Sequence, residues 1–151
     1  MTGTCHWAAT YGGGNDDLAN SVRQTSDGGY IVAGYTPSFG AGLRDVWVLK
    51  LNSAGSVQWA RTYGGSLDDE ALSVQQTSDN GYIVAGYTNS FGAGNSDFWV
   101  LKLNSAGGIT WQKAYGGGGE DRASSVQQTS DGRYIVAGYT SSFGTGDRDF
   151  W

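Results

Sequence analysis

The feature that most constrains the fold of this chain is a repeat of 52 residues that runs through it without a gap. Two sets of tryptophans recur with this period: Trp7, Trp59 and Trp111, and Trp47, Trp99 and Trp151. Self-similarity of this kind is typical of proteins that make one structural unit several times and stack the copies. We therefore expect a single repeat domain over residues 1–151, with units of approximately 1–52, 53–104 and 105–151.

The centre of each unit is a predicted β-hairpin. One copy runs from Ser73 to Thr88, and the other two begin at Ser21 and Ser125. Two short strand-like runs flank a turn of the type Ser-Asp-Gly-Gly, which is a strong hairpin signal. With the segments on either side, each unit is predicted to hold four strands in the order outer, inner, middle, middle. In the first unit these strands are Thr4–Tyr11, Ser21–Thr25, Tyr30–Thr36 and Val46–Leu51, and Val57–Tyr63 begins the next unit.

The four strands differ in their polarity, and this difference predicts the architecture. Tyr30–Thr36 is apolar on both faces, so we expect packing on both sides of it. Trp59–Tyr63 includes Arg61 and Thr62, as an outer strand next to water does. A four-stranded sheet between copies of itself is a blade of a β-propeller. The alternative all-β fold is a β-trefoil, which also has three four-stranded repeats.

Composition excludes several classes of protein. The net charge of −5 argues against nucleic acid or an anionic membrane as partner. No apolar run is long enough to cross a membrane, and residues 1–7 lack the features of a signal peptide. The single cysteine, Cys5, excludes an internal disulfide and a cysteine-rich zinc site. Cys5 and His6 are neighbours in an expected strand, where they would point to opposite faces and could not act as a nucleophile pair.

The motif Tyr63-Gly-Gly-Ser-Leu-Asp-Asp-Glu, followed by Ser78-Asp-Asn-Gly-Tyr-Ile-Val-Ala-Gly-Tyr-Thr88, resembles a family of bacterial and archaeal β-propeller repeats. The resemblance covers nearly the whole chain. Because the members of that family are mostly secreted or surface-displayed proteins, it implies an extracellular or cell-surface location. It implies no particular activity.

Acidic residues recur after each Gly-Gly loop, in the pairs Asp16 and Asp17, Asp68 and Asp69, and Glu120 and Asp121. Carboxylates beside flexible glycine backbone could bind calcium, in which case Asp17, Asp69 and Asp121 would be the ligands. Alternatively, each carboxylate accepts hydrogen bonds from backbone N–H groups and fixes its own loop. No other cofactor is expected.

An aromatic residue recurs in each Ser-Phe-Gly loop, as Phe39, Phe91 and Phe143. Such a ring either packs its loop onto the sheet or stays exposed as a stacking surface. In a blade whose strands alternate in direction, these loops lie at the same end as the acidic loops, together with Arg44 and Arg148. We therefore expect ligand binding at this end, through the acidic pairs and the phenylalanines.

The predicted function is a non-enzymatic binding or scaffold module that recognises carbohydrate or protein at a cell surface. The alternative is a propeller-type hydrolase or lyase. An active site usually brings unlike residues together in one pocket, whereas three near-identical units offer few unlike polar residues.

The repeat number also predicts a partner. Propellers close with roughly four to eight blades, so three blades cannot encircle an axis. Two chains would form a six-bladed homodimer. We expect the N-terminal strand Thr4–Tyr11 to complete the last blade of the partner, next to Asp149–Trp151.

Overall fold

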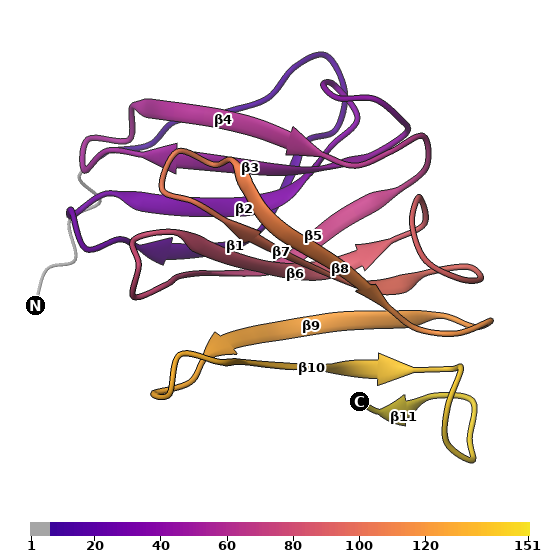
Figure 1. Cartoon of the computed structure of the whole chain (residues 1–151). Helices are drawn as coiled ribbons and strands as arrows, with labels where there is room; N and C mark the ends of the chain where they lie inside the picture. Colours follow the sequence, from indigo (N-terminus) through magenta and orange to yellow (C-terminus); the bar gives the residue numbers. More distant parts are fainter. Residues whose placement is uncertain (1–6) are drawn as a thin grey trace, which may run out of the picture.

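The computed structural model describes residues 7–151, which form three antiparallel sheets made of strands that follow one another in sequence (Figure 1). The first sheet holds β1 (Leu18–Gln24), β2 (Tyr30–Thr36), β3 (Asp45–Leu51) and β4 (Val57–Tyr63), in that order. The second holds β5 (Asp69–Gln76), β6 (Tyr82–Thr88), β7 (Asp97–Leu103) and β8 (Ile109–Tyr115). The third holds β9 (Asp121–Gln128), β10 (Tyr134–Thr140) and β11 (Asp149–Phe150). The predicted all-β class is confirmed.

The three sheets pack face to face through their inner and middle strands. β5 of the second sheet lies against β1, β2 and β3, and β9 of the third sheet lies against β5, β6 and β7. Consecutive sheets are also joined by one isolated bridge each, Arg44 to Asp68 and Ser96 to Glu120. In the part of the chain that the structure describes, no helix is long and apolar enough to cross a membrane.

Two apolar cores fill the spaces between the sheets. Ile31, Ala33, Val46 and Val48 of the first sheet pack against the second sheet. The second sheet turns its other face, with Ile83, Ala85, Phe98 and Val100, toward the third sheet. The second sheet is therefore covered on both faces, as the two-sided apolar pattern of its middle strands predicts.

A β-bulge in the first strand of each sheet explains one recurring glycine. The register between β1 and β2 shifts between Ala19 and Ser21. This shift brings the backbone of β1 very close to Gly34, where an added Cβ would lie 1.8 Å from the carbonyl oxygen of Leu18. Only glycine fits at this position, and Gly86 and Gly138 repeat the arrangement.

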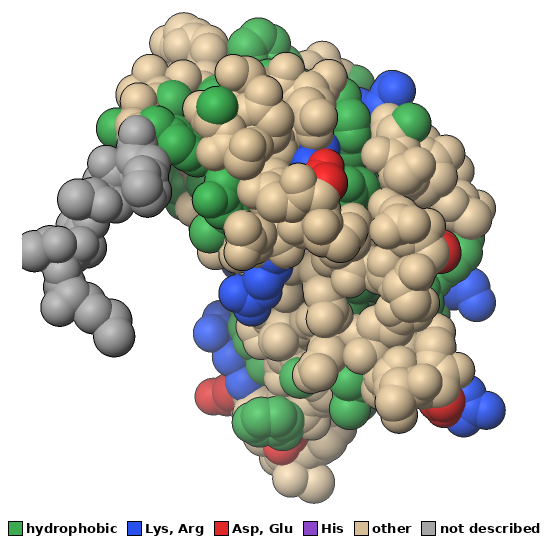
Figure 2. Space-filling model, turned by 90° about the vertical axis from the view of Figure 1, so that its left-hand side faces the viewer, with side chains coloured by type: hydrophobic (Ala, Val, Ile, Leu, Met, Phe, Trp, Pro, Cys, Tyr) green, Lys and Arg blue, Asp and Glu red, His purple; other side chains and the backbone are tan. Residues whose placement is uncertain are grey.

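The turns and loops separate to opposite ends of the strands. The tight turns that follow β1 and β3 lie at the left of Figure 1, and Lys50 of β3 donates a hydrogen bond to Asp27 in the first of them. Figure 2 looks onto this tight-turn end, where uncharged surface predominates. The Gly-Gly loops and the Ser-Phe-Gly loops lie at the other end, the long-loop end, and contact one another through Gly13 and Ser38 and their equivalents.

The prediction of a strand over Thr4–Tyr11 is wrong for residues 7–11, and residues 4–6 lie outside the described part. Residues 7–11 adopt no regular secondary structure. A strand needs a neighbour for its backbone hydrogen bonds, and no strand of the described chain lies beside this segment. The structure also lengthens two predicted strands, since β1 begins at Leu18 and β3 at Asp45.

Candidate functional site

The second acid of each pair fixes the long loops. Asp69 is fully buried and accepts hydrogen bonds from the Gly65 amide at 2.8 Å and the Ser90 hydroxyl at 2.7 Å. The Thr88 hydroxyl donates a further, short hydrogen bond to the same carboxylate. Both carboxylate oxygens thus hold the Gly-Gly loop against the Ser-Phe-Gly loop. Asp17 and Asp121 accept the same set of bonds in the other two sheets.

These hydrogen bonds affect the pKa of two of the carboxylates, Asp17 and Asp121. Burial by itself would raise the pKa of Asp121. Donation from Ser142, Thr140 and the Gly117 amide outweighs burial, so the pKa of Asp121 lies below its ordinary value. The pKa of Asp17 is lowered by the same balance. A calcium ion at either carboxylate would have to displace these donors. Among the described residues, no group of three or more His, Cys, Asp and Glu side chains is placed to hold a metal ion.

A third acid in each unit accepts hydrogen bonds from the backbone of the Ser-Phe-Gly loop. Asp45 accepts hydrogen bonds from the amides of Ala41 and Gly42 at 2.9 and 3.1 Å. Asp97 and Asp149 take part in the same way in the other sheets. These acids therefore shape the loops, and Asp45 and Asp97 are buried.

The first acid of each pair lies nearer to solvent, and Asp16 and Asp68 border a polar hollow at the junction of the first and second sheets. The hollow has a volume of about 560 Å³ and is lined by Asp16, Tyr35, Arg44 and Asp68, together with Gly14, Asn15, Pro37 and Leu43. An adjoining hollow of about 620 Å³ shares Asp16 and Tyr35. The structure thus brings Asp16 and Asp68, from two different units, to one concave surface.

Arg44 provides the positive charge of this hollow. Its guanidinium group donates to Glu70 at 2.8 Å, and its Nε lies 4.0 Å from the carboxylate of Asp68. The hydrogen bond to Glu70 is the main reason why the pKa of Arg44 is raised. The same guanidinium lies over the ring of Tyr35, 4.7 Å from its centroid. A cation over an aromatic face is attracted by the ring quadrupole, so Tyr35 and Glu70 together hold the arginine in place.

Variants of this arrangement occur at the junction of the second and third sheets and within the third unit. The guanidinium of Arg122 lies 4.1 Å from the ring centroid of Tyr87, and that of Arg148 lies 4.4 Å from the centroid of Tyr139. Glu120 accepts from Arg148 at 3.2 Å. Glu120 is therefore paired with an arginine, as Asp68 is with Arg44.

The three phenylalanines combine the two roles that the sequence left open. Each ring packs on a tryptophan of its own sheet, with centroids 5.4–5.5 Å apart in the pairs Phe39 and Trp47, Phe91 and Trp99, and Phe143 and Trp151. Each ring nevertheless keeps about half of its surface exposed. None of them lines the polar hollow, so the acids and the phenylalanines do not form one pocket.

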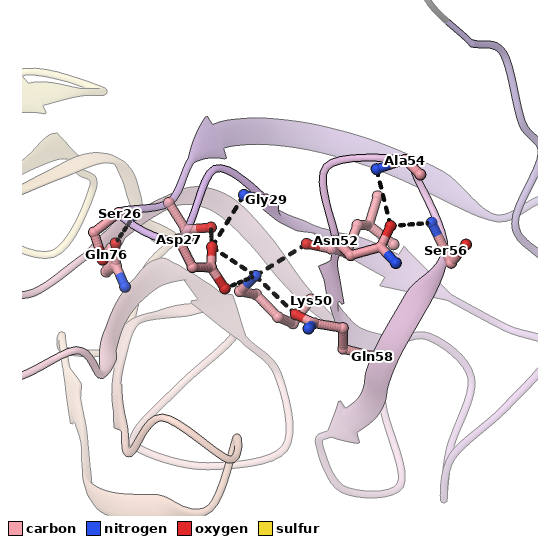
Figure 3. Close-up of polar contacts among 11 residues, drawn as sticks. Ser26, Asp27, Gly29, Lys50, Asn52, Ala54, Ser56, Gln58 and Gln76 are labelled. Carbon is pink, nitrogen blue, oxygen red and sulfur yellow. Dashed lines mark hydrogen bonds and ion pairs between the residues drawn. The ribbon is translucent and has the colours of Figure 1, made fainter.

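The tight-turn end holds a polar cluster that sequence reasoning missed (Figure 3). The Lys50 ammonium group is nearly buried and donates to Asp27 at 2.9 Å, to Gln58 at 2.9 Å and to the carbonyl of Leu51 at 2.9 Å. The sequence signal that could have revealed this cluster is a lysine in an otherwise apolar strand, which occurs at Lys50 and again at Lys102. Lys102 binds Asp79 at 2.8 Å in the same way.

Tyr35, Glu70 and Arg122 were missed for a different reason. Tyr35 lies in a strand that is apolar on both faces, as a buried strand is, and nothing in that pattern marks it as a surface residue. Glu70 and Arg122 occupy one repeat position where the first unit has Leu18, so the period gives no constant residue there. Cys5 and His6 lie outside the described residues.

Comparison with known proteins yields little. No protein-family model matches the chain. Over 138 residues the chain is 29% identical to a protein of Caulobacter vibrioides named regulatory protein FlaEY. The similarity covers 81% of this chain but only 14% of that protein.

Proposed function

We propose that this chain is a non-enzymatic binding or scaffold module made of propeller-type blades, with its ligand site at the long-loop end. The observation that carries the proposal is the polar hollow where Asp16, Asp68 and Arg44 meet beside Tyr35. Concave sites that combine an aromatic ring with a few fixed polar groups are typical of ligand recognition. Fixed acceptors and a cation suit the hydroxyl groups of a glycan, or the charged side chains of a protein, displayed at a cell surface.

Three observations support the blade interpretation over a trefoil. Each sheet is built from strands consecutive in sequence, and each packs its face on the next copy. The inner strands of neighbouring sheets also touch, since the amide of Val74 donates to Ser21 and that of Val126 donates to Ser73. A trefoil would instead pair strands of different repeats in a shared barrel.

The non-enzymatic character is supported by how the carboxylates are used. Asp17, Asp69 and Asp121 are occupied by loop donors, and Glu120 is paired with arginine. A general acid or a nucleophile needs a carboxylate that faces the reacting bond. The proposal requires no metal ion, and calcium at Asp17, Asp69 and Asp121 remains an independent prediction.

We also propose that two copies assemble head to tail into a six-bladed ring. Residues 7–11 support this, because they lie against the first sheet as β4 lies against the second. The Trp7 ring is 5.9 Å from Tyr30, as Trp59 is 5.7 Å from Tyr82. The Tyr11 hydroxyl donates to the carbonyl of Gly55, as the Tyr63 hydroxyl donates to its equivalent. The third sheet of a second copy would then supply the strand that Trp7–Tyr11 lacks.

Binding to a glycan array and to cell-surface protein extracts tests the ligand site. The triple change Asp16→Asn, Asp68→Asn and Arg44→Gln removes the charges of the hollow without touching the buried Asp69. We expect it to weaken binding by roughly tenfold or more, since lost charge-assisted hydrogen bonds are each worth about 1.5–3 kcal/mol. Ser26→Ala with Ser78→Ala at the tight-turn end is the matched control and should leave binding unchanged. Equal binding by parent and triple variant would contradict the site, and turnover of a bound glycan would contradict the non-enzymatic role.

A further inference from the structure

A hollow at the tight-turn end lies between the first and second sheets and plays no part in the proposed ligand site. This tight-turn hollow has a volume of about 460 Å³. Both sheets contribute to its walls, which include two aromatic rings and four polar side chains: Trp59, Tyr82, Asp27, Gln58, Gln76 and Asn80. The hollow is therefore formed where two four-stranded sheets meet, at the end of the molecule opposite the long loops.

Trp59 and Tyr82 form the aromatic part of the wall. Their ring centroids are 5.7 Å apart, and their planes meet edge to face at 66°. Tyr82 is buried, whereas Trp59 is only partly buried and lines the hollow. Part of the indole surface is therefore open to a ligand, and Tyr82 holds the ring in place.

Two glutamines of the hollow have oriented amide groups (Figure 3). The Lys50 ammonium group donates to Oε1 of Gln58 at 2.9 Å, and the backbone amide of Ser26 donates to Oε1 of Gln76 at 2.8 Å. Because an ammonium group and a backbone amide can only donate, each glutamine turns its carbonyl oxygen to that partner and keeps its NH2 group for another acceptor. Neither NH2 group donates a hydrogen bond within residues 7–151. The fold thus holds two unused donors at one hollow.

Asp27 supplies a fixed acceptor beside these donors. Its carboxylate accepts from Lys50 at 2.9 Å and from the Gly29 amide at 3.0 Å, and its side chain is still 52% exposed. The hydrogen bond from Lys50 is the main reason why the pKa of Asp27 is lowered, so the carboxylate stays ionised and can only accept. Among the described residues, no charged side chain other than Asp27 and Lys50 lines the hollow. Since these two charges balance, the hollow suits a neutral ligand better than an ion.

Two of the amides depart from the repeat. Asn80 has a φ of 61° and is the non-glycine residue with a positive φ in the described chain, where the other units have Gly28 and Gly132. Glycine adopts this conformation more readily than a residue with a Cβ, so the turn itself does not require an asparagine. Gln58 is not repeated either, since the third unit has Thr110 at that position. Both departures therefore add an amide side chain to the same hollow.

We infer that the tight-turn hollow binds one neutral sugar residue in its pyranose form, as a second ligand site. A pyranose ring presents C–H groups on its faces and hydroxyl groups around its rim. One face packs on Trp59, while hydroxyl groups accept from the NH2 groups of Gln58 and Gln76 and donate to Asp27. Each hydroxyl group can both donate and accept, which matches this mixture of amides and a carboxylate.

This site is independent of the ligand site at the long-loop end. The two hollows share no lining residue, and they lie at opposite ends of the strands. Variants of one hollow therefore leave the other intact, and a sugar that binds at either place can be assigned to it.

The test is titration of the full chain with the methyl glycosides of glucose, galactose and mannose, followed by nuclear magnetic resonance. The signals to follow are the side-chain amides of Gln58, Gln76 and Asn80 and the indole N–H of Trp59. We expect saturable shifts of these signals with at least one glycoside, and a dissociation constant on the order of 1 mM. Glycerol has hydroxyl groups but no apolar face and should give no saturable shift. Absence of saturable shifts with all three glycosides would overturn the inference, as would equal shifts with glycerol.

The double variant Gln58→Thr with Asn80→Gly gives the sharpest outcome. It introduces the residues that the third unit has at these positions, and glycine suits the positive φ, so the variant should fold as the parent does. We expect its affinity for the glycoside to fall by roughly tenfold or more. The control is the triple variant Asp16→Asn, Asp68→Asn and Arg44→Gln, which should bind the glycoside as the parent does. Equal affinity of the parent and the double variant would overturn the inference, and loss in the triple variant alone would place the sugar at the long-loop end instead.

Discussion

The second and third sheets contain the same seven residues, Tyr-Ile-Val-Ala-Gly-Tyr-Thr, as β6 and β10, yet the two strands differ sharply in burial. Every residue of β6 is buried, and Ile83 has no exposed surface. In β10 the equivalent Ile135 exposes 59% of its surface. Because the sequence is identical, the difference arises from the surroundings of each strand: the sheet that covers it, and the third strand beside it, which is short in the third sheet.

This comparison shows that the burial of a strand in this repeat depends only partly on the strand's own residues. In stacked repeats, stability is approximately the sum of an intrinsic contribution from each unit and a contribution from each interface. The second sheet has two interfaces, whereas the described first and third sheets have one each. Identical substitutions in the three copies should therefore have unequal effects.

The largest expected difference is between Ile83→Ala and Ile135→Ala. The first leaves a cavity between two sheets and should lower the free energy of unfolding by about 2–4 kcal/mol. At a concentration where the chain is monomeric, the second removes an exposed side chain and should cost less than about 0.5 kcal/mol. Urea denaturation of both variants measures the difference. Equal losses would mean that the outer face of the third sheet is covered in solution.

The acidic pairs provide a second contrast. Asp69→Ala removes the acceptor of the Gly65 amide and the Thr88 and Ser90 hydroxyls, and should destabilise the fold by about 2–3 kcal/mol because buried donors lose their partner. Asp16→Ala, at an exposed position, should change stability by less than about 0.5 kcal/mol. Thermal unfolding of the two variants is the measurement. A neutral Asp69→Ala would show that the loops do not need this carboxylate.

The smallest expected effect is the acid sensitivity of the ion pair between Asp79 and Lys102. The hydrogen bond from Lys102 is the main cause that lowers the pKa of Asp79. Stability from a lowered carboxylate pKa is fully present above the unfolded value of about 3.9 and is lost as the pH falls through the lower folded pKa. Because Asp79 is largely exposed, we expect the pair to contribute less than about 1 kcal/mol.

Denaturation of the parent and of Asp79→Asn at pH 7 and near pH 2 measures this contribution. The variant should be less stable at pH 7 and should lose less stability on acidification. Asp131→Asn is the matched control, since its carboxylate has no lysine in the described chain and should have the smaller effect at pH 7. A larger loss of stability from Asp131→Asn than from Asp79→Asn at pH 7 would contradict the contribution of the ion pair.

Much of the fold could be predicted from the sequence. Tyr30–Thr36 and Val57–Tyr63 were predicted with the bounds that the structure gives them, because turn residues and glycines mark both ends. The loops and tight turns were also assigned to the correct ends. Strand polarity predicted which strands lie in the middle of each sheet, since burial on two faces requires apolar residues on both.

The remainder depends on contacts between units, which the repeat pattern does not show. The start of β1 was missed because the residue at its first position differs between the units, as Leu18, Glu70 and Arg122 do. Within the candidate site, the recurrence of the acids was informative but their roles were not. Asp17 and Asp16 are neighbours in sequence, and only the fold shows that one fixes a loop while the other borders a hollow.

Hydrogen exchange at a concentration where the chain is monomeric tests the central claim most directly, because it compares the three copies of one strand in a single experiment. The account predicts that the amides of β6 exchange most slowly, and that those of Tyr134–Ala137 in β10, at the open edge, exchange fastest. Equal protection of β6 and β10 in the monomer would contradict the claim that neighbouring sheets, rather than the strand sequence, determine the stability of each copy.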